Sequence, residues 1–196
     1  MERPLKFADG FIDDVAQVLK RLLQKQRRID PQNPYAAALY VLGQQEATVI
    51  GRMVRVPKKA KAANTEKKAK SPIAHAEMNV ICNAREKLYR SLKKPVEERK
   101  SFCLFVNTRP CPMCTAAIVN AQIFNVYFFF ENGYRKDISE AIIRAKQADI
   151  AAKQKEEGNS GTRQQLRTFT FQELDSKWKD EFRRLSEKPR AKSPAK

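Results

Sequence analysis

Residues 101–130, which read SFCLFVNTRPCPMCTAAIVNAQIFNVYFFF, decide the fold. Two apolar segments in this stretch, Ser101–Val106 and Phe124–Phe130, are predicted strands. The second is almost entirely apolar, which is typical of a strand covered on both faces, so its phenylalanines are expected in the core. Between them, Pro112–Gln122 is a predicted helix. A strand, a helix and a strand in this order predict parallel strands joined by a right-handed crossover.

The same alternation continues on both sides of this stretch. A helix is predicted before it at Ala74–Leu92, and a helix at Ile138–Lys155 and a strand at Leu166–Phe171 follow it. Apolar residues at helical spacing then predict a last helix that packs against the sheet. This last helix is predicted to carry Leu174, Trp178, Phe182 and Leu185.

The N-terminal part adds a helix and a hairpin. A helix is predicted over Asp9–Arg27, because apolar residues recur there at 3.6-residue spacing. Two apolar segments, Ala36–Leu42 and Ala47–Val56, are predicted to form an antiparallel hairpin, although the alanine-rich first segment also suits a helix.

Together these elements predict an α/β fold, a three-layer α/β/α sandwich around a mixed five-stranded sheet. In such sheets, sites form where strands end and helices begin. The chain is expected to divide into an N-terminal helical extension (residues 1–34), one domain (35–186) with a basic insertion at 57–70, and a basic tail (187–196).

The charge of the chain is strongly positive. Its 196 residues include 39 Lys and Arg against 22 Asp and Glu, a net charge of +17. Residues 57–70 and 183–196 each contribute +5, from six basic residues and one glutamate. An excess of this size favours polyanions as partners, nucleic acid above all. The alternative is a solvated loop and tail that improve solubility or direct the protein to the nucleus.

Other classes of protein are excluded by composition. Apolar residues make up 42% of the chain, enough for a core, so global disorder is excluded. No apolar run approaches the roughly 18 residues of a membrane span. Residues 1–4, Met-Glu-Arg-Pro, lack the apolar stretch of a signal peptide. We therefore expect a cytoplasmic protein, with the nucleus as the alternative, and no membrane partner. Reduced cysteines are expected there.

Four residues at the starts of two predicted helices can carry chemistry. The single histidine, His75, precedes Glu77 by two positions, and Pro110 is followed by Cys111 and Cys114. If both helix N-termini face each other, one imidazole and two thiolates can bind one Zn²⁺ and leave a fourth position for water. Helix N-termini lower thiol pKa values, which favours the thiolates. A bound water with a pKa lowered towards ~7 would supply hydroxide.

Glu77 is not needed as a ligand and could transfer the proton of that water to a leaving group. The alternative is a zinc-stabilised fold without catalysis, which needs a fourth ligand. Cys82 lies about 10 Å from His75 along the helix, too far to share the ion. Cys103, in a predicted strand, is expected in the core. An open three-ligand site is therefore favoured.

The sequence resembles the cytidine deaminase-like superfamily over roughly residues 35–171. Two segments carry the likeness, PIAHAEMN at residues 72–79 and PCPMCTAAIV at residues 110–119. They follow the H-x-E…P-C-x-x-C pattern of zinc nucleobase deaminases. The chain looks most similar to the branch of tRNA adenosine, guanine and deoxycytidylate deaminases, a branch in which strands four and five are parallel.

The resemblance implies hydrolytic loss of ammonia from an exocyclic amine. It implies one zinc ion held by His75, Cys111 and Cys114, with Glu77 as the proton shuttle. It also implies that backbone groups of Ala76 and Pro110 lie near the reacting base. Dimers are common in this branch, so a homodimer, or a heterodimer with another deaminase-fold subunit, is expected.

Three positions bear on the substrate. Many tRNA-type members have an acidic residue just before Pro-Cys, where this chain has Arg109. They also bind the substrate sugar through an asparagine after the second strand, and Asn64 in the basic insertion is the nearest candidate. Asn79, which follows His-Ala-Glu-Met, makes this segment similar to that of the deoxycytidylate deaminases.

Three functions are consistent with these patterns. Deamination of adenosine to inosine in tRNA or another RNA combines the motif with the basic charge. Deamination of deoxycytidylate or of another free nucleotide or base is the alternative. A catalytically silent RNA-binding subunit is the third, although Glu77 would have no use in it.

Overall fold

The structure of the chain, a computed structural model, describes residues 7–29, 34–41, 49–52, 75–93, 101–133, 135–157 and 168–187. Five strands form one sheet in the order β2-β1-β3-β4-β5. The basic insertion at 57–70, Asn64 within it and the tail from residue 188 lie outside the described residues. The predicted division into extension, domain and tail stays a prediction.

The sheet is mixed, as predicted. β1 (Ala36–Val41) pairs antiparallel with both β2 (Val49–Arg52) and β3 (Phe102–Val106). β4 (Asn125–Phe128) and β5 (Thr170–Glu173) continue the sheet parallel to β3. The hairpin and the parallel fourth and fifth strands are therefore confirmed, and the helical alternative for the segment that begins at residue 36 is wrong.

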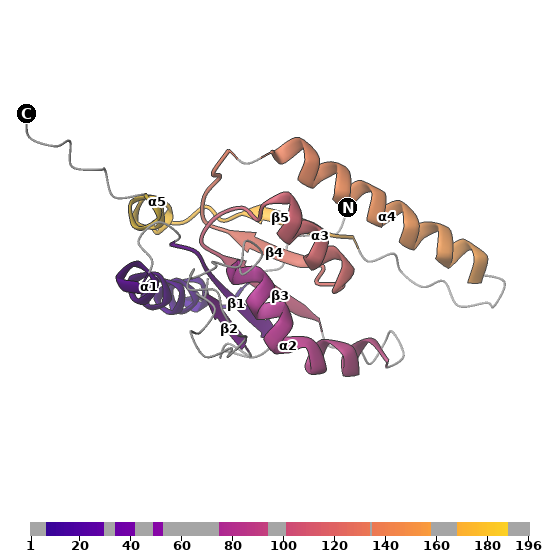
Figure 1. Cartoon of the computed structure of the whole chain (residues 1–196), viewed down its shortest axis with the longest axis horizontal. Helices are drawn as coiled ribbons and strands as arrows, with labels where there is room; N and C mark the ends of the chain where they lie inside the picture. The colour runs from indigo at the N-terminus through magenta and orange to yellow at the C-terminus, as the bar shows by residue number, and fades with distance from the viewer. Residues whose placement is uncertain are drawn as a thin grey trace, which may run out of the picture.

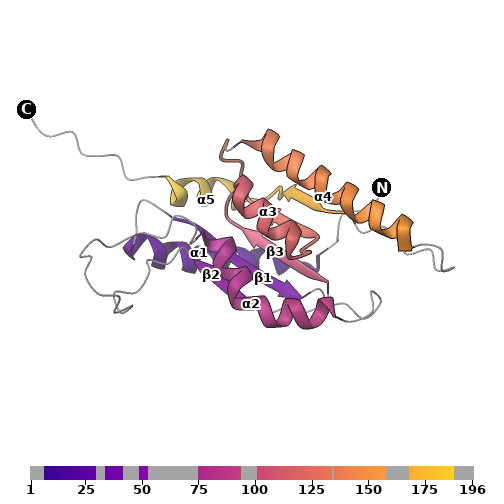
Figure 2. The ribbon, with the colours of Figure 1, turned by 45° about the vertical axis from the view of Figure 1, so that its right-hand side comes forward.

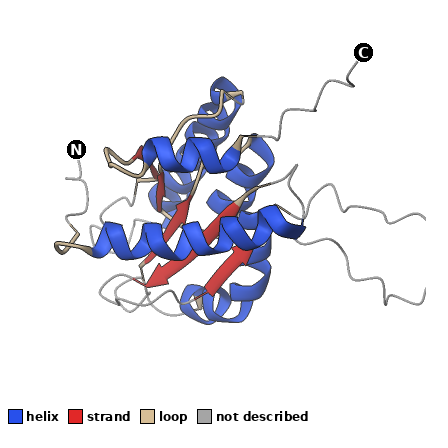
Figure 3. Ribbon diagram, turned by 90° about the vertical axis from the view of Figure 1, so that its left-hand side faces the viewer, coloured by secondary structure: helices blue, strands red, loops and turns tan. Residues whose placement is uncertain are grey.

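Helices cover both faces of this sheet (Figure 1, Figure 3). α2 (Ala76–Leu92) and α3 (Pro112–Asn120) cover one face, and α1 (Phe11–Ile29) and α5 (Lys179–Ser186) cover the other. α4 (Lys136–Glu157) lies beside α3, as Figure 2 shows. The three-layer α/β/α sandwich is thus confirmed. No helix of the described segments is both long and apolar enough to cross a membrane.

The strands divide their side chains between two cores because successive residues of a strand point to opposite faces. In β1, Ala36, Ala38 and Tyr40 face the layer of α1 and α5. Ala37 and Leu39 face α2 and α3. The central strand β3 is buried along its whole length, which explains why its sequence reads as a continuous apolar run.

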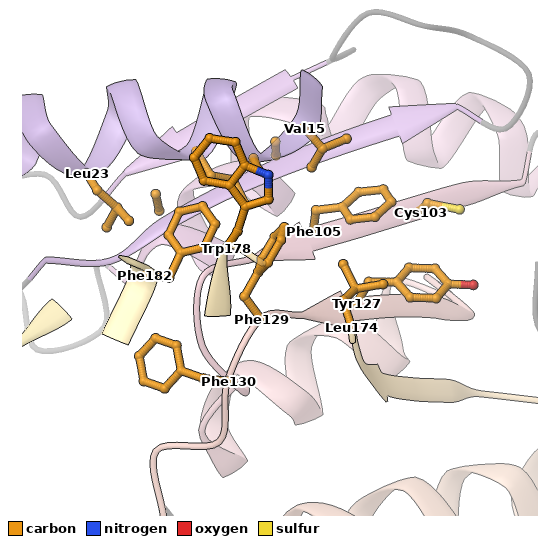
Figure 4. Packing of buried hydrophobic residues seen from close by; sticks show 14 of the residues in the cluster. Val15, Leu23, Cys103, Phe105, Tyr127, Phe129, Phe130, Leu174, Trp178 and Phe182 are labelled. Carbon is orange, nitrogen blue, oxygen red and sulfur yellow. The ribbon is translucent and has the colours of Figure 1, made fainter. Parts of the chain in front are cut away.

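The layer of α1 and α5 is rich in aromatic rings (Figure 4). The ring centroids of Phe129 and Phe182 lie 4.4 Å apart, and both side chains are fully buried. Trp178 joins the same core and donates its indole N–H to Asp13 over 2.6 Å. The packing of Trp178 and Phe182 on the sheet is therefore confirmed, as is the core position of Phe128, Phe129 and Phe130, which are at most 6% exposed.

One helix boundary was predicted wrongly. Leu174 precedes α5 by five positions and does not belong to it. Its backbone N–H donates to the carbonyl of Phe128 over 2.7 Å, so it continues the pairing of β5 with β4. The apolar side chain suits either conformation, and the sheet hydrogen bond decides between them.

Other boundaries differ by a few residues. α1 begins at Phe11, directly after Gly10, whose φ of +81° is left-handed. α3 ends at Asn120 and not at Gln122, because Gln122 itself has a φ of +53°. β4 is shorter than the predicted strand, although the two phenylalanines beyond it stay in the core.

Candidate zinc site at two helix N-termini

Two helices begin at one edge of the sheet and bring the sequence-predicted ligands together. His75 is the N-cap of α2 and Cys111 is the N-cap of α3, both with extended backbone. Cys114 follows in the first turn of α3. Neither capping side chain hydrogen-bonds its own helix. The imidazole and the two thiols can therefore point toward one another.

The distances suit a tetrahedral zinc ion. Nδ1 of His75 lies 3.6 Å from Sγ of Cys111 and 3.4 Å from Sγ of Cys114. Zinc–sulfur and zinc–nitrogen bonds at tetrahedral angles place such atoms roughly 3.5–3.6 Å apart. All three ligand atoms lie within 4.8 Å of one another. The donor set and its spacing thus fit Zn²⁺.

No fourth ligand is at hand in the described part of the chain, where no further His, Cys, Asp or Glu joins the group. Cys82 is exposed and Cys103 is buried in the core, and all four cysteines are free thiols. Burial raises the pKa of Cys103 to about 12, so this thiol stays protonated. Three ligands from protein leave one coordination position open, the arrangement of catalytic zinc sites.

The two thiols of the group differ in acidity. A hydrogen bond from Cys114 is the main cause that lowers the pKa of Cys111 to about 4, with His75 adding to it. The same hydrogen bond, with burial, raises the pKa of Cys114. The contact with Cys111 raises the pKa of His75. Cys114 keeps its proton more firmly than Cys111, and metal binding would release it.

Glu77 lies in the first turn of α2, two residues after His75, and is only 6% exposed. Burial is the main cause that raises the pKa of its carboxyl group. A side-chain hydrogen bond links it to Cys114. Glu77 is thus a buried carboxyl group beside the ligand cluster and not a member of it.

The predicted substrate contacts have a mixed outcome. Ala76 and Pro110 are buried next to the ligands, and the hydroxyl of Thr115 donates to the carbonyl of Pro110 over 3.4 Å. Their contact with a base stays a prediction. Asn64 is outside the described residues. The ring of Tyr35 is nearly parallel to that of His75, with centroids 6.3 Å apart, and sequence reasoning missed it.

Sequence reasoning also missed a buried asparagine that supports the site. Asn107, 1% exposed, lies at the end of β3, four positions before Cys111. Its Oδ1 accepts from the backbone N–H of Ala36, and its Nδ2 donates to the carbonyl of Pro34 and to Oγ of Ser186. The signal was a polar residue directly after an apolar strand, at the edge where sites form.

Arg109 is likewise built into this edge. Its side chain is 6% exposed and lies 2.7 Å from Glu131 and 3.7 Å from Glu140. Its guanidinium also lies over the ring of Phe128. Arg109, which departs from the tRNA-type pattern, therefore forms ion pairs with Glu131 between β4 and α4 and with Glu140 in α4.

An α/β/α sandwich with His, Cys and Cys at two helix N-termini is the arrangement of the zinc nucleobase deaminases. A family model described as the cytidine and deoxycytidylate deaminase zinc-binding region matches residues 33–130, half of the chain. The chain belongs to this family of zinc-type nucleoside and nucleotide deaminases. No match is found among curated proteins.

Solved structures similar to this chain include those of three kinds of deaminase. A structure from studies of A-to-I editing by tRNA:A34 deaminases is 24% identical, covering 62% of this chain and 78% of its own, with a TM-score of 0.43. The dCMP deaminase of cyanophage S-TIM5 is 17% identical, covering 72% and 95%, with a TM-score of 0.46. The guanine deaminase of Nitrosomonas europaea is 14% identical, covering 75% and 84%, with a TM-score of 0.44. Such distant similarities do not distinguish between substrates.

Proposed function

We propose that this deaminase converts adenosine to inosine in tRNA or another RNA. The reaction class rests on one observation, the convergence of His75, Cys111 and Cys114 beside the buried carboxyl group of Glu77. RNA as substrate is supported by the net charge of +17.

His75, Cys111 and Cys114 would hold the zinc ion. When bound with an open position, zinc acts as a Lewis acid and lowers the pKa of water. Glu77 would accept a proton from the attacking water and deliver it to the exocyclic nitrogen. The C–N bond then breaks, ammonia leaves, and the oxygen of the water remains on the base. The burial of Glu77 suits this role, because a raised pKa lets a carboxyl group both accept and donate the proton near neutral pH.

Deoxycytidylate is a second candidate, and Asn79 favours it. Asn79 is half-buried in the first turn of α2, and its backbone N–H donates to the carbonyl of His75. Residues four apart lie on the same side of a helix, so Asn79 lies on the side that carries the ligand. Arg109, which pairs with Glu131, stands just before Pro110 and Cys111, where many tRNA-type members have an acidic residue.

Mass-spectrometric analysis of nucleosides from tRNA incubated with the zinc-loaded protein tests the proposal. Parallel reactions contain deoxycytidylate, cytosine compounds and guanine. The matched variant is Glu77→Gln, which keeps the shape of the side chain and should keep bound zinc. Loss of the proton carrier is expected to lower turnover roughly 10²–10⁴-fold.

Inosine formed by the wild type but not by Glu77→Gln is the expected result. If the protein turns over deoxycytidylate and forms no inosine, adenosine in RNA is not its substrate and deoxycytidylate is. Full activity of Glu77→Gln would remove the proposed role of this residue. Zinc content, measured on both proteins, separates loss of the proton carrier from loss of the metal. The expected dimer stays a prediction.

A further inference from the structure

A basic surface lies on the layer formed by α1 and α5. The segment Lys20–Ile29 of α1 contains five basic residues and no acidic one. Three of these, Arg21, Lys25 and Arg28, are exposed and lie at spacings of four and three, so they share one side of the helix. Arg184 in the last turn of α5 is exposed as well. We refer to Arg21, Lys25, Arg28 and Arg184 as the α1/α5 surface.

The charges of the α1/α5 surface are not neutralised by ion pairs among the described residues. The two acids of α5 have other partners: Glu181 pairs with Lys20 over 2.8 Å and Asp180 with Arg183 over 3.5 Å. Glu187, the C-cap residue of α5, is exposed and forms no ion pair with the surface in the described segments. Among the described residues, these four exposed cations therefore have no ion-pair partner.

The helix dipole does not explain these positions. Cations are favoured in the last turn of a helix, which accounts for Arg28. Arg21 and Lys25 lie further inside α1, where the effect of the dipole has faded. Neither residue packs in the core, so both charged side chains are accessible to an external ligand.

The α1/α5 surface lies toward the edge of the sheet that carries the zinc site. Nη1 of Arg27, in the last turn of α1, donates to the carbonyl of Arg184 over 3.4 Å. Two residues further, Ser186 accepts a 2.8 Å hydrogen bond from Asn107. Asn107 directly follows β3, at the end of the strand that leads to Cys111, so the ends of α1 and α5 lie at this edge of the sheet.

We infer that the α1/α5 surface binds the phosphate backbone of RNA next to the reacting base. This inference rests on the proposed function, because it assumes that the base is presented by RNA. Exposed Arg and Lys side chains contact phosphates without reading sequence, and each contact releases a counterion. The surface would hold the backbone while the base is placed at the site.

A binding titration of a fluorescently labelled tRNA transcript tests this role over a range of salt concentrations. The full chain, loaded with zinc, is compared with the variant Arg21→Gln/Lys25→Gln/Arg28→Gln/Arg184→Gln. Arg27 is left intact because it holds the two helices together. The control variant removes the same charge from α2 and α4, where exposed residues are available. It carries Arg85→Gln, Arg90→Gln, Arg144→Gln and Lys153→Gln.

The α1/α5 variant should bind the transcript roughly tenfold or more weakly near 0.1 M salt, and the slope of log K against log salt should fall by about 3. The control variant should change both much less. Equal weakening by the two variants would overturn the inference and leave the proposed function standing. A wild-type protein that does not bind the transcript would contradict both. Turnover of a free nucleoside by the α1/α5 variant should equal that of the wild type.

Discussion

Arg109 and Glu131 form a 2.7 Å ion pair across 22 positions of sequence. The two side chains differ in burial, since that of Arg109 is 6% exposed and that of Glu131 is 35% exposed. The backbone N–H of Arg109 also donates to the carbonyl of Phe130. The turn that leads to the cysteine ligands is thereby fixed to the segment after β4.

Because the two side chains differ in burial, their removal should lower the free energy of unfolding by different amounts. Glu131→Gln leaves a buried guanidinium with Glu140 as its nearest acid, and should lower the free energy of unfolding by roughly 2–3 kcal/mol. Arg109→Met leaves a carboxylate that water and Lys136 can reach, and should cost roughly 1–2 kcal/mol. Urea unfolding of the zinc-loaded proteins measures both. The reverse order would contradict the asymmetry.

Asn107 should matter more than its polar partner on α5. Asn107→Ala removes three hydrogen bonds and leaves the N–H of Ala36 without its acceptor, at a cost of roughly 2–3 kcal/mol. Ser186→Ala removes one of them and should cost about 1 kcal/mol or less. Denaturant unfolding of the two variants and of the double variant gives the comparison. Because they share one hydrogen bond, the two costs should not add fully.

The thiols should differ sharply in reactivity once the metal is removed. With a pKa of about 4, Cys111 is a thiolate throughout the neutral range, so its alkylation rate should stay nearly constant between about pH 6 and about pH 8. An ordinary thiol with a pKa of about 8.5 becomes roughly tenfold faster per pH unit below that value.

Peptide mass spectrometry of chelator-treated protein follows this reaction at each cysteine. A Cys82→Ser background removes the exposed thiol, and the buried thiol of Cys103 should label only after unfolding. Added zinc should protect Cys111. A tenfold rise per pH unit at Cys111 would show that the thiolate is not stabilised in the metal-free site.

Asp13 should contribute a pH-dependent part of stability. Hydrogen bonds from Trp178 and Lys177 lower its pKa below the ordinary 3.8. A carboxyl group with a lowered folded pKa stabilises the protein above its unfolded pKa, and this contribution is lost as the pH falls through the folded pKa. The stability difference between wild type and Asp13→Asn should therefore be constant above about pH 5 and shrink below 3.8. Thermal unfolding against pH measures it, and a difference that grows in acid would have the wrong sign.

The sheet and the ligand group could be predicted because both depend on local patterns. The apolar run that ends at Phe130 and the alternation of elements around it are sufficient for parallel strands. The convergence of His75, Cys111 and Cys114 could be predicted because zinc accepts few residue types in few spacings. The N-terminal placement of both motifs then followed from the predicted helix starts.

The supporting contacts could not be predicted in the same way. Glu131 and Ser186 meet their partners across 22 and 79 positions, and nothing in a local pattern selects those pairs. Leu174 was assigned to a helix because its spacing to Trp178 is helical, whereas a backbone hydrogen bond to β4 holds it in the sheet. Tertiary contacts of this kind outweigh local preference.

The layer of α1 and α5 has a consequence for biosynthesis. α1 is the first described helix to leave the ribosome and α5 is the last, yet the two pair with each other through Lys20 and Glu181 and cover the same aromatic face. Until α5 has emerged, Phe129 lacks the ring of Phe182 that covers it. A nascent chain that already contains the whole zinc site therefore still shows an uncovered aromatic surface, the kind of surface that leads to aggregation or recruits chaperones. All three proposed zinc ligands are therefore synthesised before the helix that completes the aromatic core.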